Sequence, residues 1–313
     1  MSKKATYTAI KWLFVIAALA YLAYKLIAFD RCNEFFEQWQ QIPIKRFWWL
    51  AGVIALLPVN WALESVKWIR ITSHIQKLSF LQSLKGVLAG ITTGFFTPNR
   101  IGDLVGRIIF LRPQHRTAGV TLSLLNSLTQ NLIIIFCGIP ACILLFSRND
   151  NTDSGIQTYI LISIALLIVF TLFYFFLPCL SKKIERTKLG KKINEFIACL
   201  SQYSTSDLVG IIIISLFRYL VFSTQFFLML RFFDVDLMPW QAALAIPTNY
   251  LFVTFTPSVA FSEAALRASY AVFVIGFFSD QTLNIAFAGI AIWIVNWVIP
   301  LLAGSIVMLK QKE

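Results

Sequence analysis

The chain has 313 residues, of which 58% are apolar and only 13% are charged, and its formal net charge is +12. A mean hydropathy of +0.73 excludes a soluble globular enzyme and indicates an integral membrane protein. Lys and Arg gather in short segments between the apolar stretches, as the positive-inside rule describes. We therefore expect no nucleic-acid partner, and a contribution of these bases to holding anionic lipid headgroups.

Six apolar stretches are long enough to cross a bilayer, which takes about 20 helical residues. The first resembles a signal peptide with a small-residue site at Ala18–Ala20, but its apolar run continues to Phe29. We expect an uncleaved span there. The predicted spans are 10–29, 47–69, 117–147, 157–180, 208–232 and 283–309.

The charges between spans predict the orientation of the chain. The segment Ser181–Ser206 is rich in Lys and Arg and is expected inside, whereas Arg148–Gly155 and Phe233–Leu237 carry aspartates and are expected outside. Lysines near both ends place both termini in the cytoplasm. The sequence thus predicts a multi-pass protein of a bacterial inner membrane.

Two regions, 81–116 and 239–280, must enter and leave the membrane on the same side to fit this orientation. Gly86–Phe96 has a length of about 16 Å as a helix, which is half a bilayer. We expect two re-entrant hairpins that bend at Thr97-Pro98 and Thr256-Pro257. The second arm of the second hairpin, Pro257–Phe278, is long for a half-span, and the sequence leaves half-span and full span open.

The two hairpins also resemble each other. At a constant offset of 159 residues, five identities run from Leu78 to Pro98 in the first copy and from Leu237 to Pro257 in the second. Opposite predicted orientations make this an inverted-topology repeat, an architecture that binds substrate near the midplane. Within one membrane domain, 1–313, we expect a first span and connector (1–45), repeat 1 (46–147), a linking span and basic loop (148–206) and repeat 2 (207–313).

Thr97 and Thr256 have the chemistry of helix N-caps, and Pro98 and Pro257 suit the first helical position. Helix starts carry partial positive charge, and Arg100 lies beside the first of them. Two such starts meeting in the membrane would form a phosphate site.

Each Thr-Pro is followed by an acid and an arginine four residues apart: Asp103 and Arg107, then Glu263 and Arg267. This spacing puts each pair on one helix face. We expect the arginines to bind phosphate and the acids to gate the site or couple it to an ion. Arg218, deep in a span, is a further phosphate-binding cation, with Glu263 as its candidate partner.

For the other polar residues we expect structural roles. Glu64 lies close to Lys67 and Arg70, which favours an interfacial ion pair. Asn126 and Gln130 share a helix face and are expected to form interhelical hydrogen bonds. The five cysteines have no metal-ligand or disulfide spacing. With no nucleotide-binding loop either, we expect no metal and no cofactor.

The segment Phe95–Asp103 with Arg107, and Thr256-Pro257 with Glu263–Leu266, resemble the lysylphosphatidylglycerol synthase transmembrane-region family of flippase-like membrane proteins. Where that family has a glycine-rich Pro-Gly-Gly-x-Gly, this sequence has Pro257–Phe261. Full-length members add an aminoacyl transferase, which is expected to be absent here because the sequence ends at Glu313. The resemblance implies the lipid-translocating half, and stand-alone members are associated with glycosyltransferases or isoprenoid-lipid pathways.

Together these features predict a flippase or transporter, not an enzyme, that moves an anionic phospholipid or a polyprenyl-phosphate lipid across the inner membrane. Two alternatives stay open: a scaffold for a glycosyltransferase or cell-envelope lipid pathway, and an intramembrane lipid-modifying enzyme. The identity of the lipid, the direction, the energy coupling and a homo-oligomeric state also stay open.

Overall fold

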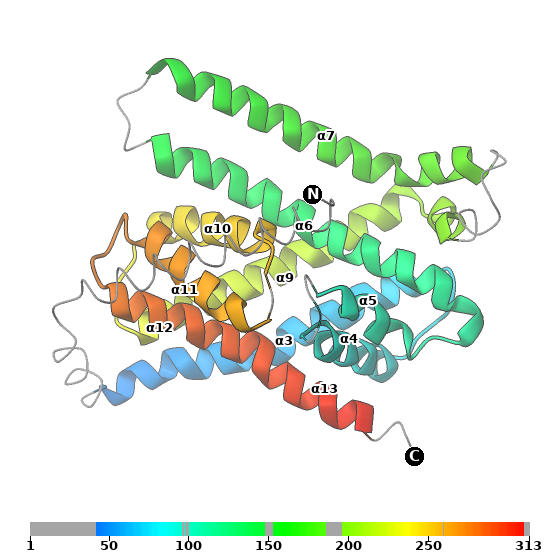
Figure 1. Ribbon diagram of the computed structural model, residues 1–313, viewed down its shortest axis with the longest axis horizontal. Helices are drawn as coiled ribbons and strands as arrows, with labels where there is room; N and C mark the ends of the chain where they lie inside the picture. The colour runs from blue at the N-terminus through cyan, green and yellow to red at the C-terminus, as the bar shows by residue number, and fades with distance from the viewer. Residues whose placement is uncertain are drawn as a thin grey trace, which may run out of the picture. The chain divides into compact units, whose positions relative to one another are not determined.

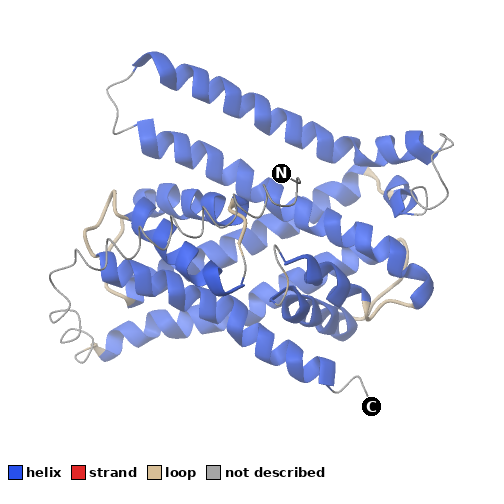
Figure 2. Cartoon of the chain, in the orientation of Figure 1, coloured by secondary structure: helices blue, strands red, loops and turns tan. Residues whose placement is uncertain are grey.

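The computed structural model describes residues 42–95, 97, 100–147, 153–185, 196–258 and 260–309. These residues form helices and loops and contain no strand (Figure 2). The predicted all-α membrane fold is confirmed. The predicted first span and Pro98 lie outside the described residues.

Five of the predicted spans correspond to helical segments long and apolar enough to cross a membrane. They extend the predicted ranges by a few residues at one or both ends, because flanking polar residues continue the helices. The segments are η1 (Ile44–Arg46) with α3 (Phe47–Thr72), η3 (Pro113–His115) with α6 (Arg116–Ser147), α7 (Asp153–Glu185), α9 (Thr205–Phe232), and α12 (Thr282–Trp293) with the π-helical turn η5 (Ile294–Val298) and α13 (Ile299–Leu309). A short 3-10 turn, η4 (Ala198–Gln202), precedes α9.

Short helices occupy the two Thr-Pro regions. The first pair is α4 (Phe80–Phe95) and α5 (Ile101–Ile108), and the second is α10 (Pro239–Phe255) and α11 (Ala260–Ile275). The expectation that the first arm begins at Gly86 is wrong. Ser79 and Gln82 form a reciprocal capping pair that starts α4 at Phe80. At 16 residues each, α4 and α11 are about 24 Å long, less than a full span. Re-entry itself stays a prediction.

Glycines bring α4 and α5 into close contact (Figure 1). A Cβ at Gly90 would collide with Asp103, and one at Gly106 would collide with Thr93 and the Ala89 carbonyl. The Thr93 hydroxyl instead donates to the Gly102 carbonyl at 2.7 Å. These glycines belong to two small-xxx-small patterns, Gly86-xxx-Gly90-xxx-Gly94 and Gly102-xxx-Gly106, which allow close helix contact in membranes.

The chain divides into two compact units. Unit 1 comprises residues up to Leu57, Gly138–Asp150 and Phe222–Val298; unit 2 comprises Pro58–Cys137, Asn151–Val221 and the residues from Ile299 on. Unit 2 contains α4 and α5, and unit 1 contains α10 and α11. The predicted repeat boundaries stay a prediction.

Candidate functional site

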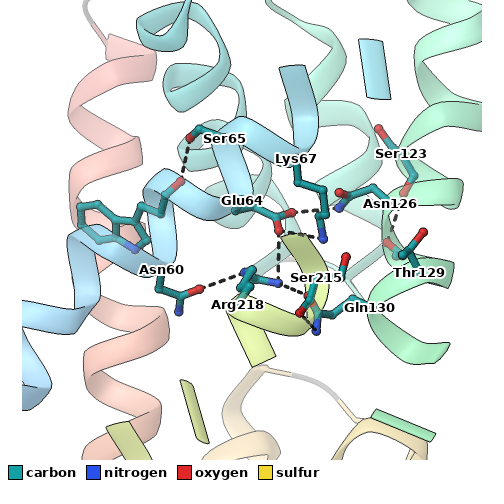
Figure 3. Close-up of polar contacts among 12 residues, drawn as sticks. Asn60, Glu64, Ser65, Lys67, Ser123, Asn126, Thr129, Gln130, Ser215 and Arg218 are labelled. Carbon is teal, nitrogen blue, oxygen red and sulfur yellow. Dashed lines mark hydrogen bonds and ion pairs between the residues drawn. The ribbon is translucent and has the colours of Figure 1, made fainter. Parts of the chain in front are cut away.

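Glu64 lies at the centre of a buried charged cluster in unit 2, with only 3% of its side chain exposed. Lys67 Nζ lies 2.9 Å from its Oε2, and Arg107 Nη1 lies 2.6 Å from its Oε1. Arg218 Nη1 lies 3.2 Å from Oε2. Asn126 Nδ2 donates to Oε1 at 2.9 Å. One carboxylate thus holds three cations and an amide from four helices: α3, α5, α6 and α9. Figure 3 shows Lys67, Asn126 and Arg218 around Glu64.

Arg107 joins this carboxylate to the hairpin. Its Nε donates to Asp103 Oδ1 at 2.9 Å, one turn earlier on α5, while its Nη1 reaches Glu64. The guanidinium also lies over the ring of Trp68, 5.7 Å from the centroid. The expected acid–arginine pair is present, and Arg107 is buried by contacts with α3.

Arg218 is held by side-chain amides as well as by Glu64. Its Nε donates to Asn60 Oδ1 at 2.9 Å, and its Nη1 donates to Gln130 Oε1 at 3.1 Å. Ser215, one turn before Arg218, is fully buried, and its hydroxyl has no hydrogen-bond partner in the described part of the chain. This hydroxyl is a further donor on the helix that carries Arg218.

The cluster carries more positive than negative charge. Lys67, Arg107 and Arg218 oppose Glu64 and Asp103, which leaves one positive charge in excess when all five are ionised. Buried charge is costly unless it is paired. The arrangement therefore favours an additional anion.

The accessible side of the cluster is formed by two of its members. The side chains of Arg218 and Asp103 are 22% and 21% exposed, whereas that of Arg107 is 5% exposed. An anion that approaches the cluster therefore meets Arg218 before it reaches Arg107 or Glu64.

The expectation that Thr97 is the N-cap residue is wrong, because α5 begins at Ile101 and its N-cap residue is Arg100. The Thr97 side chain nevertheless binds the first turn of α5. Its hydroxyl accepts from the Gly102 N–H at 2.7 Å. Arg100 immediately precedes the helix in the left-handed conformation, with φ of 59°, which is uncommon for a residue with a side chain. The structure thus keeps Thr97 and Arg100 at the helix start.

The second copy, in unit 1, differs. Arg267 pairs with Glu263 through Nε at 3.2 Å and Nη2 at 2.9 Å, so the predicted pair is present. Thr256, however, ends α10: its hydroxyl donates to the Phe252 carbonyl at 2.7 Å and hydrogen-bonds Tyr270 at 2.8 Å. The expectation that Pro257 is the first helical residue is wrong, since α11 begins at Ala260.

Sequence reasoning missed Glu64, Lys67 and Asn60 as site residues. The expected ion pair of Glu64 with Lys67 is present, but both side chains are buried and belong to a larger cluster. The structure places the Glu64 carboxylate against Arg218. The expected contact of Arg218 with Glu263 stays a prediction. Asn126 and Gln130 form the expected interhelical hydrogen bonds. The signal available in the sequence was an acid and a base three residues apart, Glu64 and Lys67, inside the predicted span 47–69.

Among the described residues, no group of histidine, cysteine and acidic side chains is arranged to hold a metal ion. The cluster is instead built from nitrogen donors around a carboxylate. Such donors recognise phosphate and carboxylate groups.

The family comparison agrees with this membrane architecture. Residues 9–304 match the profile of the lysylphosphatidylglycerol synthase TM region. No curated protein and no solved structure matches the chain. Because the match covers nearly the whole sequence, this multi-pass membrane protein belongs to the lysylphosphatidylglycerol synthase TM region family.

Proposed function

We propose that this protein binds the phosphate of an anionic lipid headgroup at the Glu64 cluster and moves that headgroup across the membrane. The observation that carries the proposal is the excess of buried cations around Glu64 in a membrane protein. A phosphodiester adds negative charge to this cluster, and guanidinium groups bind it through two hydrogen bonds at once.

Glu64 acts as an internal substitute for the lipid phosphate. With no lipid bound, its carboxylate neutralises Arg107 and Arg218 and so keeps them stable inside the membrane. A phosphate that enters beside Arg218 competes for the same guanidinium nitrogens. The cations are therefore paired both without lipid and with lipid bound, so the site can accept and release the headgroup.

The composition of the two units supports alternating access. Each unit combines one short helix pair with parts of the same four long segments: α3, α6, α9 and α12–α13. The unit with α4–α5 takes the later part of α3 and the earlier part of α9, and the unit with α10–α11 takes the opposite parts. An inverted repeat would produce this exchange, and transporters of that kind rock one part against another.

Three of these segments change unit at or near a helix irregularity. In α3 the change occurs at Pro58, in α6 at Gly138 near Pro140, and in the last segment at the end of the π-helical turn η5. Proline removes a helical hydrogen bond and allows bending. These points are suited to act as hinges.

The proposal places the protein in a bacterial inner membrane with both termini in the cytoplasm, and the net positive loops support that orientation. It also assigns transport and no catalysis to the chain. The lipid is a phospholipid or a polyprenyl phosphate, because both present the phosphate that the cluster is suited to bind.

Translocation can be measured with the purified full chain in proteoliposomes. Fluorescent phosphatidylglycerol in the inner leaflet becomes accessible to external dithionite only after transfer. We expect wild type to transfer this lipid faster than fluorescent phosphatidylcholine, and Arg218→Gln to reduce the anionic rate at least tenfold, since one charged hydrogen-bond partner is lost.

Arg46→Gln is the matched control. Arg46 pairs with Asp234 at 2.6 Å in unit 1 and is absent from the cluster. It should leave the rate unchanged. Equal transfer by wild type, Arg218→Gln and protein-free vesicles would reject translocation and leave the scaffold role as the stronger account.

A further inference from the structure

Unit 2 contains a second basic site, an open cavity of about 610 Å³. It lies where the connector after α3 meets the connector between α5 and α6. Its basic side chains are Lys77, Arg112 and His115, and its described lining contains no acidic residue. Lys77 and Arg112 are exposed, so their charges are available to a ligand.

The polar wall of this cavity is fixed by hydrogen bonds. Gln76 Oε1 accepts from the backbone N–H of Arg112 at 3.0 Å, which ties two connectors together. Gln82 is held by its capping interaction with Ser79. These hydrogen bonds hold the backbone segments that carry the basic side chains.

Two helices begin at this cavity. The lining residue Gln82 is in the first turn of α4, and the lining residue His115 directly precedes α6. Helix starts carry partial positive charge and favour anions. This effect adds to the positive charges of Lys77 and Arg112.

The lining of the cavity also includes apolar residues. Ile75, Phe110 and Leu111 contribute to its lining beside the basic groups. A free inorganic anion makes no use of such a surface, whereas the glycerol and first methylenes of a lipid do. The volume is within the range of about 300–1,000 Å³ that ligand pockets have.

We propose that this cavity is a separate binding site for the phosphate of an anionic lipid. Lys77 and Arg112 bind the phosphate, and Phe110 contacts the glycerol region. By the positive-inside rule the cavity faces the cytoplasmic leaflet, where anionic headgroups are available. The inference stands apart from translocation, because none of these residues belongs to the Glu64 cluster.

Binding can be measured by native mass spectrometry on the full chain in nanodiscs of phosphatidylcholine. The probes are dihexanoyl phosphatidylglycerol, dihexanoyl phosphatidylcholine and inorganic phosphate. The protein carries Arg218→Gln to weaken the first site. We expect Lys77→Gln with Arg112→Gln to weaken binding of the anionic lipid on the order of thirtyfold, because two surface charges are lost.

Two controls separate this result from misfolding and from general charge loss. Lys77→Arg with Arg112→Lys keeps the charge and should keep the affinity. Lys182→Gln with Lys183→Gln removes the same charge from exposed positions at the end of α7 and should bind like its parent. Arg112 supports the fold through its backbone N–H, which substitution retains.

Unchanged affinity in the Lys77 and Arg112 double variant, or an equal loss in the α7 control, would overturn the proposal. Binding of inorganic phosphate as tight as that of the anionic lipid would overturn the lipid assignment. Loss of translocation in Arg107→Gln with intact binding at this cavity would support two separate sites, and binding without any translocation would reject only the proposed transport.

Discussion

The helix pairs α4–α5 and α10–α11 share a sequence pattern, but the arginine of each pair has different ion-pair partners. In unit 2, Arg107 bridges Asp103 and Glu64 and is almost fully buried. In unit 1, Arg267 pairs with Glu263 one turn earlier on its own helix. At the 159-residue offset, Ser223 and Phe226 of α9 replace Glu64 and Lys67 of α3. Both helix pairs therefore carry an acid–arginine pair, and in unit 2 Glu64 of α3 links its arginine to further cations.

Of the changes that separate the two helix pairs, removal of the Glu64 carboxylate should have the largest effect on stability. Glu64→Ala leaves the buried Lys67 and Arg107 and the partly exposed Arg218 without their common partner, and we expect a loss of about 3–5 kcal/mol in the free energy of unfolding. Ser223→Ala, at the equivalent position, should change it by less than about 1 kcal/mol. Chemical unfolding in detergent micelles measures both. Equal stability of the two variants would contradict the assignment of Glu64 to the centre of the cluster.

Helix packing gives a second way to separate the copies. Gly106→Ala places a methyl group against Thr93 and Ala89, so we expect a loss of about 1–3 kcal/mol. Gly106 directly precedes Arg107, and the residue directly before Arg267 is Leu266, which is buried. Gly52→Ala is the control: its nearest new contact is the flexible end of Leu228 at 3.1 Å. If Gly106→Ala proved as stable as Gly52→Ala, the close contact of α4 and α5 would be wrong.

Substitution of Thr97 and of Thr256 should change the free energy of unfolding by smaller amounts. Thr97→Val removes the acceptor of the Gly102 N–H, with an expected loss of about 1 kcal/mol. Thr256→Val should lose roughly half as much, because the Phe252 carbonyl still accepts from the Thr256 N–H at 3.1 Å. Thermal unfolding monitored by circular dichroism compares them. A larger loss of stability for Thr256→Val than for Thr97→Val would contradict this prediction.

The smallest change in stability is expected at the hinge positions. Pro58→Ala restores a helical N–H where α3 passes from unit 1 to unit 2, and a stiffer helix should slow lipid transfer severalfold without weakening lipid binding. Pro178→Ala, in a helix that lies within unit 2, is the control. Dithionite-based transfer rates provide the measurement, and equal rates for the two variants would argue against a hinge at Pro58.

Local chemistry made much of the fold predictable. Apolar length identified five helical segments, and the four-residue spacing identified both acid–arginine pairs. The preference of threonine for helix starts indicated that the Thr97 hydroxyl binds a first-turn amide of α5, although the N-cap residue itself is Arg100. The wider role of Glu64 was missed because only Lys67 and Arg70 lie near it in sequence, while its other partners come from α5, α6 and α9. Those contacts depend on how helices pack, as does the burial of Lys67, and one sequence contains no direct record of packing.

The end of α10 shows a different limit. Thr256 and Pro257 have the residue types of a helix start, yet the Thr256 hydroxyl bonds back to α10 and to Tyr270. The same side chain can cap either neighbouring helix, and the tertiary position of Tyr270 decides between them.

The most direct test is an experimental structure of the full chain reconstituted with phosphatidylglycerol. The proposed function predicts lipid phosphate density within hydrogen-bond distance of Arg218 and Arg107, with the Glu64 carboxylate withdrawn from at least one of them. Lipid phosphate bound only at Arg267, with the contacts of Glu64 to Arg107 and Arg218 intact, would contradict it.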